Sequence, residues 1–266
     1  MNKKSVYRIL MALCLIGFWL FENFYTSAID LESASKETSS NFPMELLPNS
    51  TTGAVIQHSY YSLSYHEKHE QAEWVAYVLE RDQLTYDDRQ RPDFMEDPKV
   101  ASFSADERNY RRSGYDRGHL CPAGDRRFSD LAYYETFYTS NISPQDNAFN
   151  AGIWNTLEQK VRYWCKIYGV VYVITGGVLE DDLLTIGDEE VSVPHYFYKI
   201  IVRKEGDTLQ MIGFLFENKE SGTSLKMHLV TIDELERKTG INFFEKLPDR
   251  QQQQLESKII IEGWKF

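Results

Sequence analysis

A short stretch near the middle of the chain combines a titratable base with a planar cation. His119 follows Asp116, Arg117 and Gly118 directly. A neutral imidazole can take a proton from water near neutral pH, and the guanidinium fork of arginine matches the oxygens of a phosphate group. Gly118 lets the backbone approach another group closely. These residue types indicate general-base chemistry on an anionic substrate, although a lone Arg-x-His pair more often caps a turn and binds a surface acid.

The surroundings of His119 are basic although the chain as a whole is acidic. The sequence has 29 Lys and Arg against 40 Asp and Glu, a formal net charge of −11, which argues against unspecific coating of nucleic acid or of an anionic membrane. Within residues 108–127, however, six bases accompany two acids, and all six are arginines: Arg108, Arg111, Arg112, Arg117, Arg126 and Arg127. Because arginine favours bidentate contact with phosphate, Arg111, Arg112 and Arg126 are predicted to bind nucleic acid.

A second polar group lies on a predicted helix over residues 147–167. Asn150, Trp154, Glu158 and Arg162 are spaced by four. Successive members drift only about 40° around the axis at 3.6 residues per turn, so they form one slowly turning stripe. Amide and carboxylate oxygens suit a hard cation such as Mg²⁺. The alternative interpretation is a solvent-facing Glu158–Arg162 pair with Asn150 as a helix cap.

The elements that must position these residues point to a single domain over residues 51–266. β-Rich apolar runs predict strands at residues 74–79, 170–175, 196–202 and 211–216. Thr231 followed by Glu234 predicts the start of a late helix, which Gly240 ends. Strands interrupted by a long central helix and a late one predict an α+β fold with a mixed sheet core. Cys121 and Cys165 are candidates for a disulfide that their spacing alone does not decide.

The first residues predict export. An apolar run of 13 residues, Ile9–Phe21, follows three bases and is shorter than the about 20 residues of a spanning helix. Thr26 and Ala28 are small enough for cleavage after Ala28, so residues 1–28 are predicted to be a signal peptide of a secreted or periplasmic protein. An uncleaved membrane anchor is the alternative. Residues 29–50 are polar and turn-rich and are predicted to be a linker without a core of its own.

Taken together, the motifs resemble those of the DNA/RNA non-specific endonucleases. These ββα-metal nucleases include secreted bacterial sugar-non-specific nucleases and mitochondrial endonuclease G. The resemblance rests on Asp-Arg-Gly-His at 116–119, Asn-Ile-Ser-Pro-Gln at 141–145, Asn-Ala-Gly-Ile-Trp at 150–154 and Leu-Glu at 157–158, in that order. It extends from about residue 58 to residue 249 and implies an α+β fold with a ββα-metal finger catalytic motif and a long central helix.

The resemblance also implies roles for individual residues. His119 would be the general base that activates the attacking water, and Asn150 the direct protein ligand of a hydrated Mg²⁺, for which Mn²⁺ could substitute. Glu158 would hold a water of that ion. Asn141 would position His119 or the waters, and Arg117 would contact phosphate or arrange the site.

Two further arginines match the family with less certain spacing. Arg91 precedes Asp97-Pro98 and would stabilise the charge of the phosphorane-like transition state. Arg162 matches a helix arginine and is expected to contact nucleic acid. The implied activity is magnesium-dependent hydrolysis of phosphodiester bonds in DNA and RNA, with little sequence specificity and 5′-phosphate products. No nucleotide cofactor is expected, and a homodimer is left open.

Two other classes of function were weighed. A non-catalytic nucleic-acid-binding protein on the same fold would need the basic residues but not His119, Asn150 and Glu158 together. A polysaccharide or ester hydrolase is disfavoured because the sequence has no Gly-x-Ser-x-Gly motif. If His119 is the base, activity should rise with pH through about 6.5, where an unperturbed imidazole loses its proton.

Overall fold

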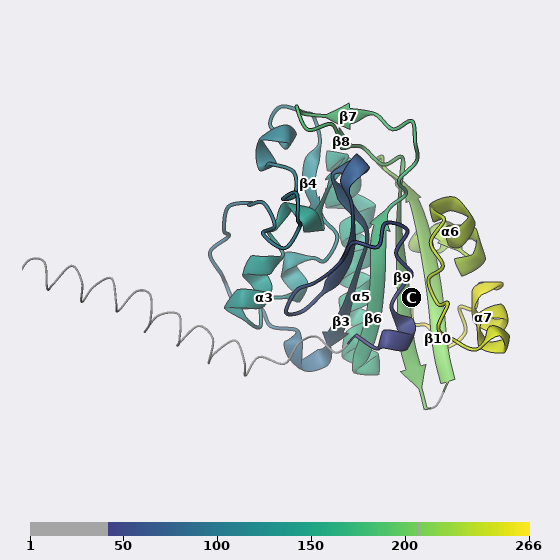
Figure 1. The fold of residues 1–266 in the computed structure, drawn as a ribbon. Coiled ribbons are helices and arrows are strands. Elements are labelled where there is room, and N and C mark those ends of the chain that lie inside the picture. Colours follow the sequence, from purple (N-terminus) through teal and green to yellow (C-terminus); the bar gives the residue numbers. More distant parts are fainter. Residues whose placement is uncertain (1–41, 207) are drawn as a thin grey trace, which may run out of the picture. The chain divides into compact units, whose positions relative to one another are not determined.

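A computed structural model describes residues 42–206 and 208–266. At its centre is a seven-stranded sheet with the order β1-β2-β3-β6-β9-β10-β11, in which all neighbouring strands are antiparallel (Figure 1). The strands are β1 (Val55–Gln57), β2 (Ser62–His66), β3 (Gln71–Glu80), β6 (Val170–Gly177), β9 (Tyr196–Glu205), β10 (Thr208–Glu217) and β11 (Leu229–Val230). The four strands predicted from apolar runs are the central strands β3, β6, β9 and β10, and the α+β class is confirmed.

The sheet separates two apolar cores. Because side chains alternate between the faces of a strand, the odd-numbered residues 75–79 of β3 pack in one core and the even-numbered residues 74–78 in the other. Helix α5 (Asn155–Tyr168) covers the first core. Helices α6 (Ile232–Thr239) and α7 (Asp249–Glu256) cover the second, on the opposite side of the sheet (Figure 1).

Residues 42–50 pack against the second core although they fall within the predicted linker. The short helix η2 (Met44–Leu46) buries Leu46 completely, and Phe42 and Leu47 join the same cluster. The indole N–H of Trp74 donates to the carbonyl of Asn49 at 2.8 Å. This part of the turn-rich segment therefore belongs to the folded domain, because three apolar side chains anchor it. The predicted signal peptide and the rest of the predicted linker lie outside the described residues.

The motif residues lie on a hairpin and the helical segment that follows it. Strands β4 (Asp116–His119) and β5 (Ile142–Gln145) form a two-stranded antiparallel sheet in which Asp116 pairs with Gln145 and His119 with Ile142. The chain continues through α4 (Asn147–Phe149) and η8 (Asn150–Trp154) into α5. Strand, strand and helix thus follow one another as the resemblance implies.

The predicted continuous helix over residues 147–167 is interrupted. Segment η8 is a π-helix, and Gly152 leaves the helical region at φ −95° and ψ −108°. A π-turn shifts every later side chain around the axis, so the four-residue spacing does not produce a single stripe. Trp154 is fully buried in the core, while Asn150 and Glu158 remain partly exposed.

The remaining elements are short. They are α3 (Asp130–Glu135), the strand pair β7 (Thr185–Ile186) and β8 (Val191–Ser192), and the 3₁₀ turns η3 (Glu67–His69), η4 (Arg81–Gln83), η5 (Glu107–Tyr110), η6 (Ala123–Asp125), η7 (Thr139–Asn141) and η9 (Leu225–His228). The late helix begins as predicted, because the Thr231 hydroxyl accepts the N–H of Glu234 and Gly240 ends the helix with a φ of 73°. Among the helices of residues 42–266, none combines the length and apolar character needed to cross a bilayer.

Cys121 and Cys165 are both buried and are free thiols in the described structure. The Cys165 thiol donates to the carbonyl of Leu79 at 3.3 Å. Burial raises the pKa of Cys121 to about 11 and that of Cys165 to about 12. The two thiols therefore serve as core residues, which answers the question their spacing left open.

Candidate active site

Arg117 and His119 lie beside two aromatic rings, Phe94 and Phe137, which together form an aromatic wall. They are two residues apart on β4 and so share one face of the strand. The guanidinium carbon of Arg117 lies 5.1 Å from the ring centroid of Phe94, and the imidazole centroid of His119 lies 5.6 Å from the same point. Phe137 closes the imidazole from another side, with the two rings edge to face at 5.1 Å. The two rings hold the imidazole in one orientation.

Arg91 reaches the same wall from the loop that carries Phe94. Its guanidinium carbon lies 5.2 Å from the centroid of Phe94 and 5.5 Å from that of Phe137. The structure therefore brings together the three residues Arg91, Arg117 and His119, as predicted. Phe94 and Phe137 were not predicted, because nothing in their local sequence distinguishes them from ordinary core residues.

The imidazole of His119 is neutral and has an unpaired nitrogen. Burial, reinforced by the charge of Arg91, lowers its pKa to about 3. Its Nε2 is buried and has no hydrogen-bond partner among the described residues. Since buried polar atoms are nearly always paired in proteins, this nitrogen is a candidate contact for a bound ligand. In the free protein the titration of His119 therefore lies well below the value of about 6.5 expected from its residue type.

Asn150 is tied to the first residue of β4. Its Nδ2 donates to Asp116 Oδ2 at 2.9 Å, and the amide of Asn147 donates to the other oxygen of the same carboxylate. A carboxylate only accepts, so the NH₂ end of the Asn150 amide must face Asp116. The amide oxygen of Asn150 has no hydrogen bond within residues 42–266 and remains available to a cation. Asp116 thus acts as the brace between hairpin and helix.

Glu158, on α5, belongs to a cluster of charged side chains with Asp125, Arg162 and Lys199. Arg162 donates from Nε to Asp125 Oδ1 at 2.5 Å, and its Nη2 lies 3.5 Å from Glu158 Oε2. Burial raises the pKa of Glu158 to about 7, against the opposing charges of Lys199 and Arg162. The Nζ of Lys199 is buried, has no hydrogen-bond partner in the described structure, and lies 4.4 Å from the Trp154 ring centroid. The predicted Glu158–Arg162 pair exists, but it is largely enclosed rather than solvent-facing.

Two arginines predicted to bind nucleic acid form contacts with other groups of the protein instead. Arg126 is fully buried, and its guanidinium donates to the carbonyls of Asp125, Tyr60 and Val78. Arg162 holds the buried Asp125. Both predictions are corrected, because a charge count along the sequence does not distinguish an arginine that satisfies interior acceptors from one that faces solvent.

Arg111 and Arg112 remain at the surface. The side chain of Arg111 is 63% exposed and pairs with Glu107, which also binds Arg117. Both arginines line a cavity of about 510 Å³ between residues 106–113 and residues 186–189. Because Glu107 links Arg111 to Arg117, this cavity adjoins the arginines of the aromatic wall. Their contact with nucleic acid stays a prediction.

Asn141 acts through the backbone rather than through the imidazole. It is fully buried; its Oδ1 accepts the N–H of Cys121 at 2.8 Å, while its Nδ2 donates to the carbonyls of Cys121 and Thr136 at 3.0 and 2.9 Å. The backbone N–H of Leu120, the residue after His119, donates to the carbonyl of Asn141 at 2.9 Å. Asn141 therefore fixes the chain directly after His119, and its role in positioning the base stays a prediction.

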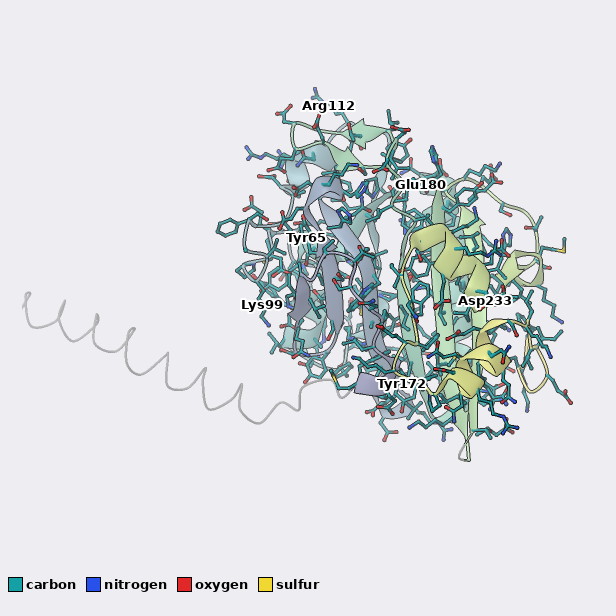
Figure 2. All side chains as sticks on the ribbon, turned by 45° about the vertical axis from the view of Figure 1, so that its right-hand side comes forward. Tyr65, Lys99, Arg112, Tyr172, Glu180 and Asp233 are labelled. Carbon is teal, nitrogen blue, oxygen red and sulfur yellow. The ribbon has the colours of Figure 1, made fainter. Side chains whose placement is uncertain are left out.

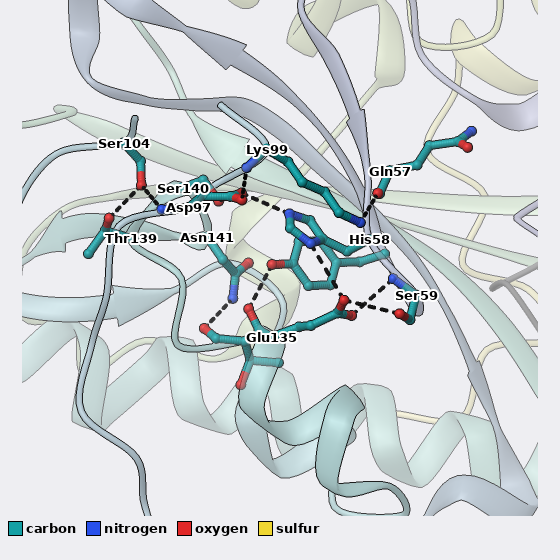
Figure 3. Close-up of polar contacts among 12 residues, drawn as sticks. Gln57, His58, Ser59, Asp97, Lys99, Ser104, Glu135, Thr139, Ser140 and Asn141 are labelled. Carbon is teal, nitrogen blue, oxygen red and sulfur yellow. Dashed lines mark hydrogen bonds and ion pairs between the residues drawn. The ribbon is translucent and has the colours of Figure 1, made fainter. Parts of the chain in front are cut away.

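A buried ionic network supports the loop that carries Asn141 (Figure 3). His58 Nε2 donates to Asp97 Oδ2 at 2.8 Å, and its Nδ1 lies 3.7 Å from Glu135 Oε1. The hydroxyl of Ser140 also donates to Asp97, at 2.5 Å. Burial alone would lower the pKa of His58, but the hydrogen bonds and charges of Asp97 and Glu135 outweigh it and raise that pKa. Nothing in the local sequence reveals this network, because its members lie up to 82 positions apart, from His58 to Ser140.

Comparisons with known proteins identify the relatives of this chain. The family model described as DNA/RNA non-specific endonuclease matches residues 39–250. Nuclease EXOG, mitochondrial, of Danio rerio is 36% identical over 210 residues, which cover 73% of this chain and 60% of that protein. Endonuclease G, mitochondrial, of Homo sapiens is 34% identical over 198 residues, covering 69% of this chain and 67% of that protein. A crystal structure of the EndoG/EndoGI complex superposes with a TM-score of 0.69 at 37% identity, covering 74% of this chain and 88% of that one.

These comparisons correct one prediction and confirm another. The relatives are mitochondrial nucleases, which contradicts the expected secreted or periplasmic location. A basic and apolar N-terminal sequence does not by itself specify a compartment. The chain spans less than two thirds of the length of the Danio rerio relative. The family match nevertheless covers most of the chain and includes every motif of the hairpin and helix, so the chain belongs to the DNA/RNA non-specific endonuclease family.

Proposed function

We propose that this chain is a divalent-cation-dependent endonuclease that hydrolyses phosphodiester bonds in DNA and RNA with little sequence specificity. The observation that carries the proposal is the β4–β5 hairpin with its following helix. It presents an unpaired imidazole nitrogen at His119 and fastens Asn150 to Asp116 at the start of the same strand. The nuclease names of the relatives support the same activity.

The residues around Asn150 fit a hard cation. The donor set is the free amide oxygen of Asn150 with the nearby carboxylate of Asp116, and Glu158 follows on the next helix. Mg²⁺ prefers such oxygen ligands and usually keeps several waters, and Mn²⁺ accepts the same ligands. When bound, the cation would supply Lewis-acid stabilisation of the negative charge that develops on the phosphate and the leaving oxygen.

His119 would take the proton of the attacking water at Nε2. Its pKa of about 3 keeps the imidazole neutral in the free protein, so the lone pair is available. An imidazole with so low a pKa is a weak base, but a phosphate beside it favours the protonated form and raises its pKa towards the working pH. The base thus gains proton affinity when substrate is present. In-line attack by the water would leave a 5′-phosphate and a 3′-hydroxyl.

Arg91 and Arg117 would bind the substrate phosphate. Both guanidinium groups lie against Phe94, close to His119, and their planar forks match phosphate oxygens. Arg117 would exchange its contact with Glu107 for the phosphate. Such contacts carry no base information, which supports cleavage with little sequence preference.

Digestion of plasmid DNA and of a structured RNA by the full chain tests the proposal. With Mg²⁺ both substrates should be cut, and a chelator should abolish cleavage. Asn150→Ala should lower cleavage at a fixed low Mg²⁺ concentration by about 10²-fold, because metal sites typically lose 10–100-fold in affinity or activity when a supporting group is removed. Asn147→Ala is the matched control, since it removes the other amide on Asp116 and leaves the cation ligand in place.

Two outcomes would contradict the proposal. Cleavage that persists in excess chelator would exclude the cation. Salt-sensitive binding of both nucleic acids without any cleavage under Mg²⁺ or Mn²⁺ would favour the non-catalytic binding protein instead.

A further inference from the structure

Three carboxylates converge between α6 and α7, on the side of the sheet opposite α5. Asp233 and Glu236 lie one turn apart on α6, and Glu256 is the last residue of α7. One oxygen of each lies within 4.8 Å of those of the other two. Figure 2 labels Asp233 on α6, at the face of the domain formed by the two C-terminal helices. This acidic cluster is separate from the hairpin and from the helix that carry Asn150 and His119.

The cluster has no positive partner among the described residues. The charges that act on Glu256 are those of Glu236 and Asp233, and the three carboxylates form no ion pair with a lysine or arginine of residues 42–266. Glu236 Oε1 accepts the N–H of Phe243 at 2.9 Å. Like charges at this separation repel one another, so a cation among the three carboxylates would stabilise the arrangement, and no described lysine or arginine supplies one.

Glu256 is the informative member. It is only 5% exposed, and its Oε1 is buried without a hydrogen-bond partner in the described structure. Asp233 lies in the first turn of α6, where the helix dipole favours an acid, whereas Glu256 lies at the end of α7, where the dipole disfavours one. Burial and the two neighbouring acids raise the pKa of Glu256 to about 7. An enclosed, unpaired carboxylate directed at two others is unusual unless something cationic lies between them.

We propose that Asp233, Glu236 and Glu256 bind a hard divalent cation, for which Ca²⁺ is the best fit. The donor set consists only of oxygens, which Ca²⁺ prefers at 2.3–2.6 Å, so two ligands of one ion lie up to about 5 Å apart. The 4.8 Å limit on the three oxygens satisfies this geometry, with water completing the coordination. Mg²⁺ demands a tighter octahedron and fits less well. The ion would tie α6 to α7 and stabilise the domain, and this proposal does not depend on the nuclease activity.

Thermal unfolding of the chelator-treated full chain, with and without Ca²⁺, tests the site. Ca²⁺ at a hundred-fold excess over Kd should raise Tm by about 5–10 °C in a domain of this size. Glu256→Gln should abolish that rise, and in the absence of Ca²⁺ it should itself raise Tm, because it removes one of three like charges. Glu234→Gln is the matched control on α6 and should keep the full response to Ca²⁺.

A second pair of variants separates this site from the proposed nuclease centre. Asn150→Ala should retain the Ca²⁺-dependent rise in Tm, and Asp233→Asn, at a partly exposed position that tolerates change, should lose it even if Glu256→Gln fails to fold. No rise in the unmodified chain would overturn the proposal. So would a rise that survives Asp233→Asn, or one that Asn150→Ala removes, because the ion would then lie elsewhere.

Discussion

His58 is buried and His119 is partly buried with its Nε2 enclosed, yet carboxylates surround the first and aromatic rings surround the second. Asp97 and Glu135 raise the pKa of His58, while the enclosure of His119, with Arg91 beside it, lowers its pKa to about 3. Burial disfavours the charged imidazole in both places. The neighbours therefore decide at which histidine the protonated form is favoured and which one keeps a free lone pair.

The surroundings of His58 and those of His119 have different roles in the protein. The network of His58 bonds the imidazole to Asp97 and supports the loop before β5, so its contribution is to stability. His58 Nδ1 also lacks a hydrogen bond, but it lies 3.7 Å from the Glu135 carboxylate rather than beside arginines. No described residue forms a hydrogen bond with Nε2 of His119, so that atom is free to contact a ligand. An unpaired polar atom beside two arginines is stronger evidence for a catalytic site than a perturbed pKa alone.

The largest expected effect is on catalysis. His119→Ala should lower kcat/KM on plasmid DNA and RNA by about 10²–10⁴-fold, the range typical of a lost general base. The variant also loses the ring contacts with Phe94 and Phe137, so a thermal unfolding scan must show that it is folded at the assay temperature. His195→Ala, which alters a histidine with a side chain 61% exposed, is the control and should retain full activity. An active His119→Ala would exclude the base assignment.

The next effect is on stability. His58→Ala should lower the free energy of unfolding by about 3–5 kcal/mol, because it leaves Asp97 and Glu135 as uncompensated buried charges. Urea unfolding at pH 6 measures the change, with His195→Ala again as the reference. A loss of less than about 1 kcal/mol, as for an exposed pair, would show that the network contributes little and would remove the contrast between the two histidines.

The smallest effect is the pH dependence of that stability. The raised pKa of His58 means that its contribution is fully present below its ordinary value of 6.5 and is lost as pH rises through the higher folded value. Burial would raise the pKa of Asp97, but His58 lowers it overall, so the contribution of Asp97 is present above 3.8 and is lost as pH falls through its folded value. The Tm difference between the unmodified chain and His58→Ala should therefore be greatest at about pH 5–6 and narrow in alkaline buffer. A constant difference from pH 5 to 9 would contradict a charged His58.

Much of the fold was predictable because its signals are local. The short β-rich apolar runs located β3, β6, β9 and β10, and the order of the motifs located the hairpin and its helix. The interruption at Gly152 was not predictable from spacing, since the apolar period continues through it. Residues 42–50 looked like a linker because their prolines and polar residues together outnumber the three apolar anchors that decide their packing.

The site shows the same division between local and distant signals. His119, Arg117 and Asn150 follow from motifs, and Arg91, chosen for its place before Asp97-Pro98, lies against the same rings as the base, while its catalytic role stays a prediction. Lys199 and the partners of His58 become visible only when strands far apart in the sequence meet. Arg126 was misassigned for the same reason, because the carbonyls that bind it belong to β3 and to residues preceding β2 as well as to its own neighbour.

The central sheet ends in its shortest strands, with three residues in β1 and two in β11. A long open border would present rows of unpaired amide and carbonyl groups on which another chain could grow. The two terminal strands themselves offer a second copy only a few residues to pair with. The long edge lies instead on β10, of whose ten residues β11 pairs with only Gly213 and Phe214, so any growth of the sheet would begin there.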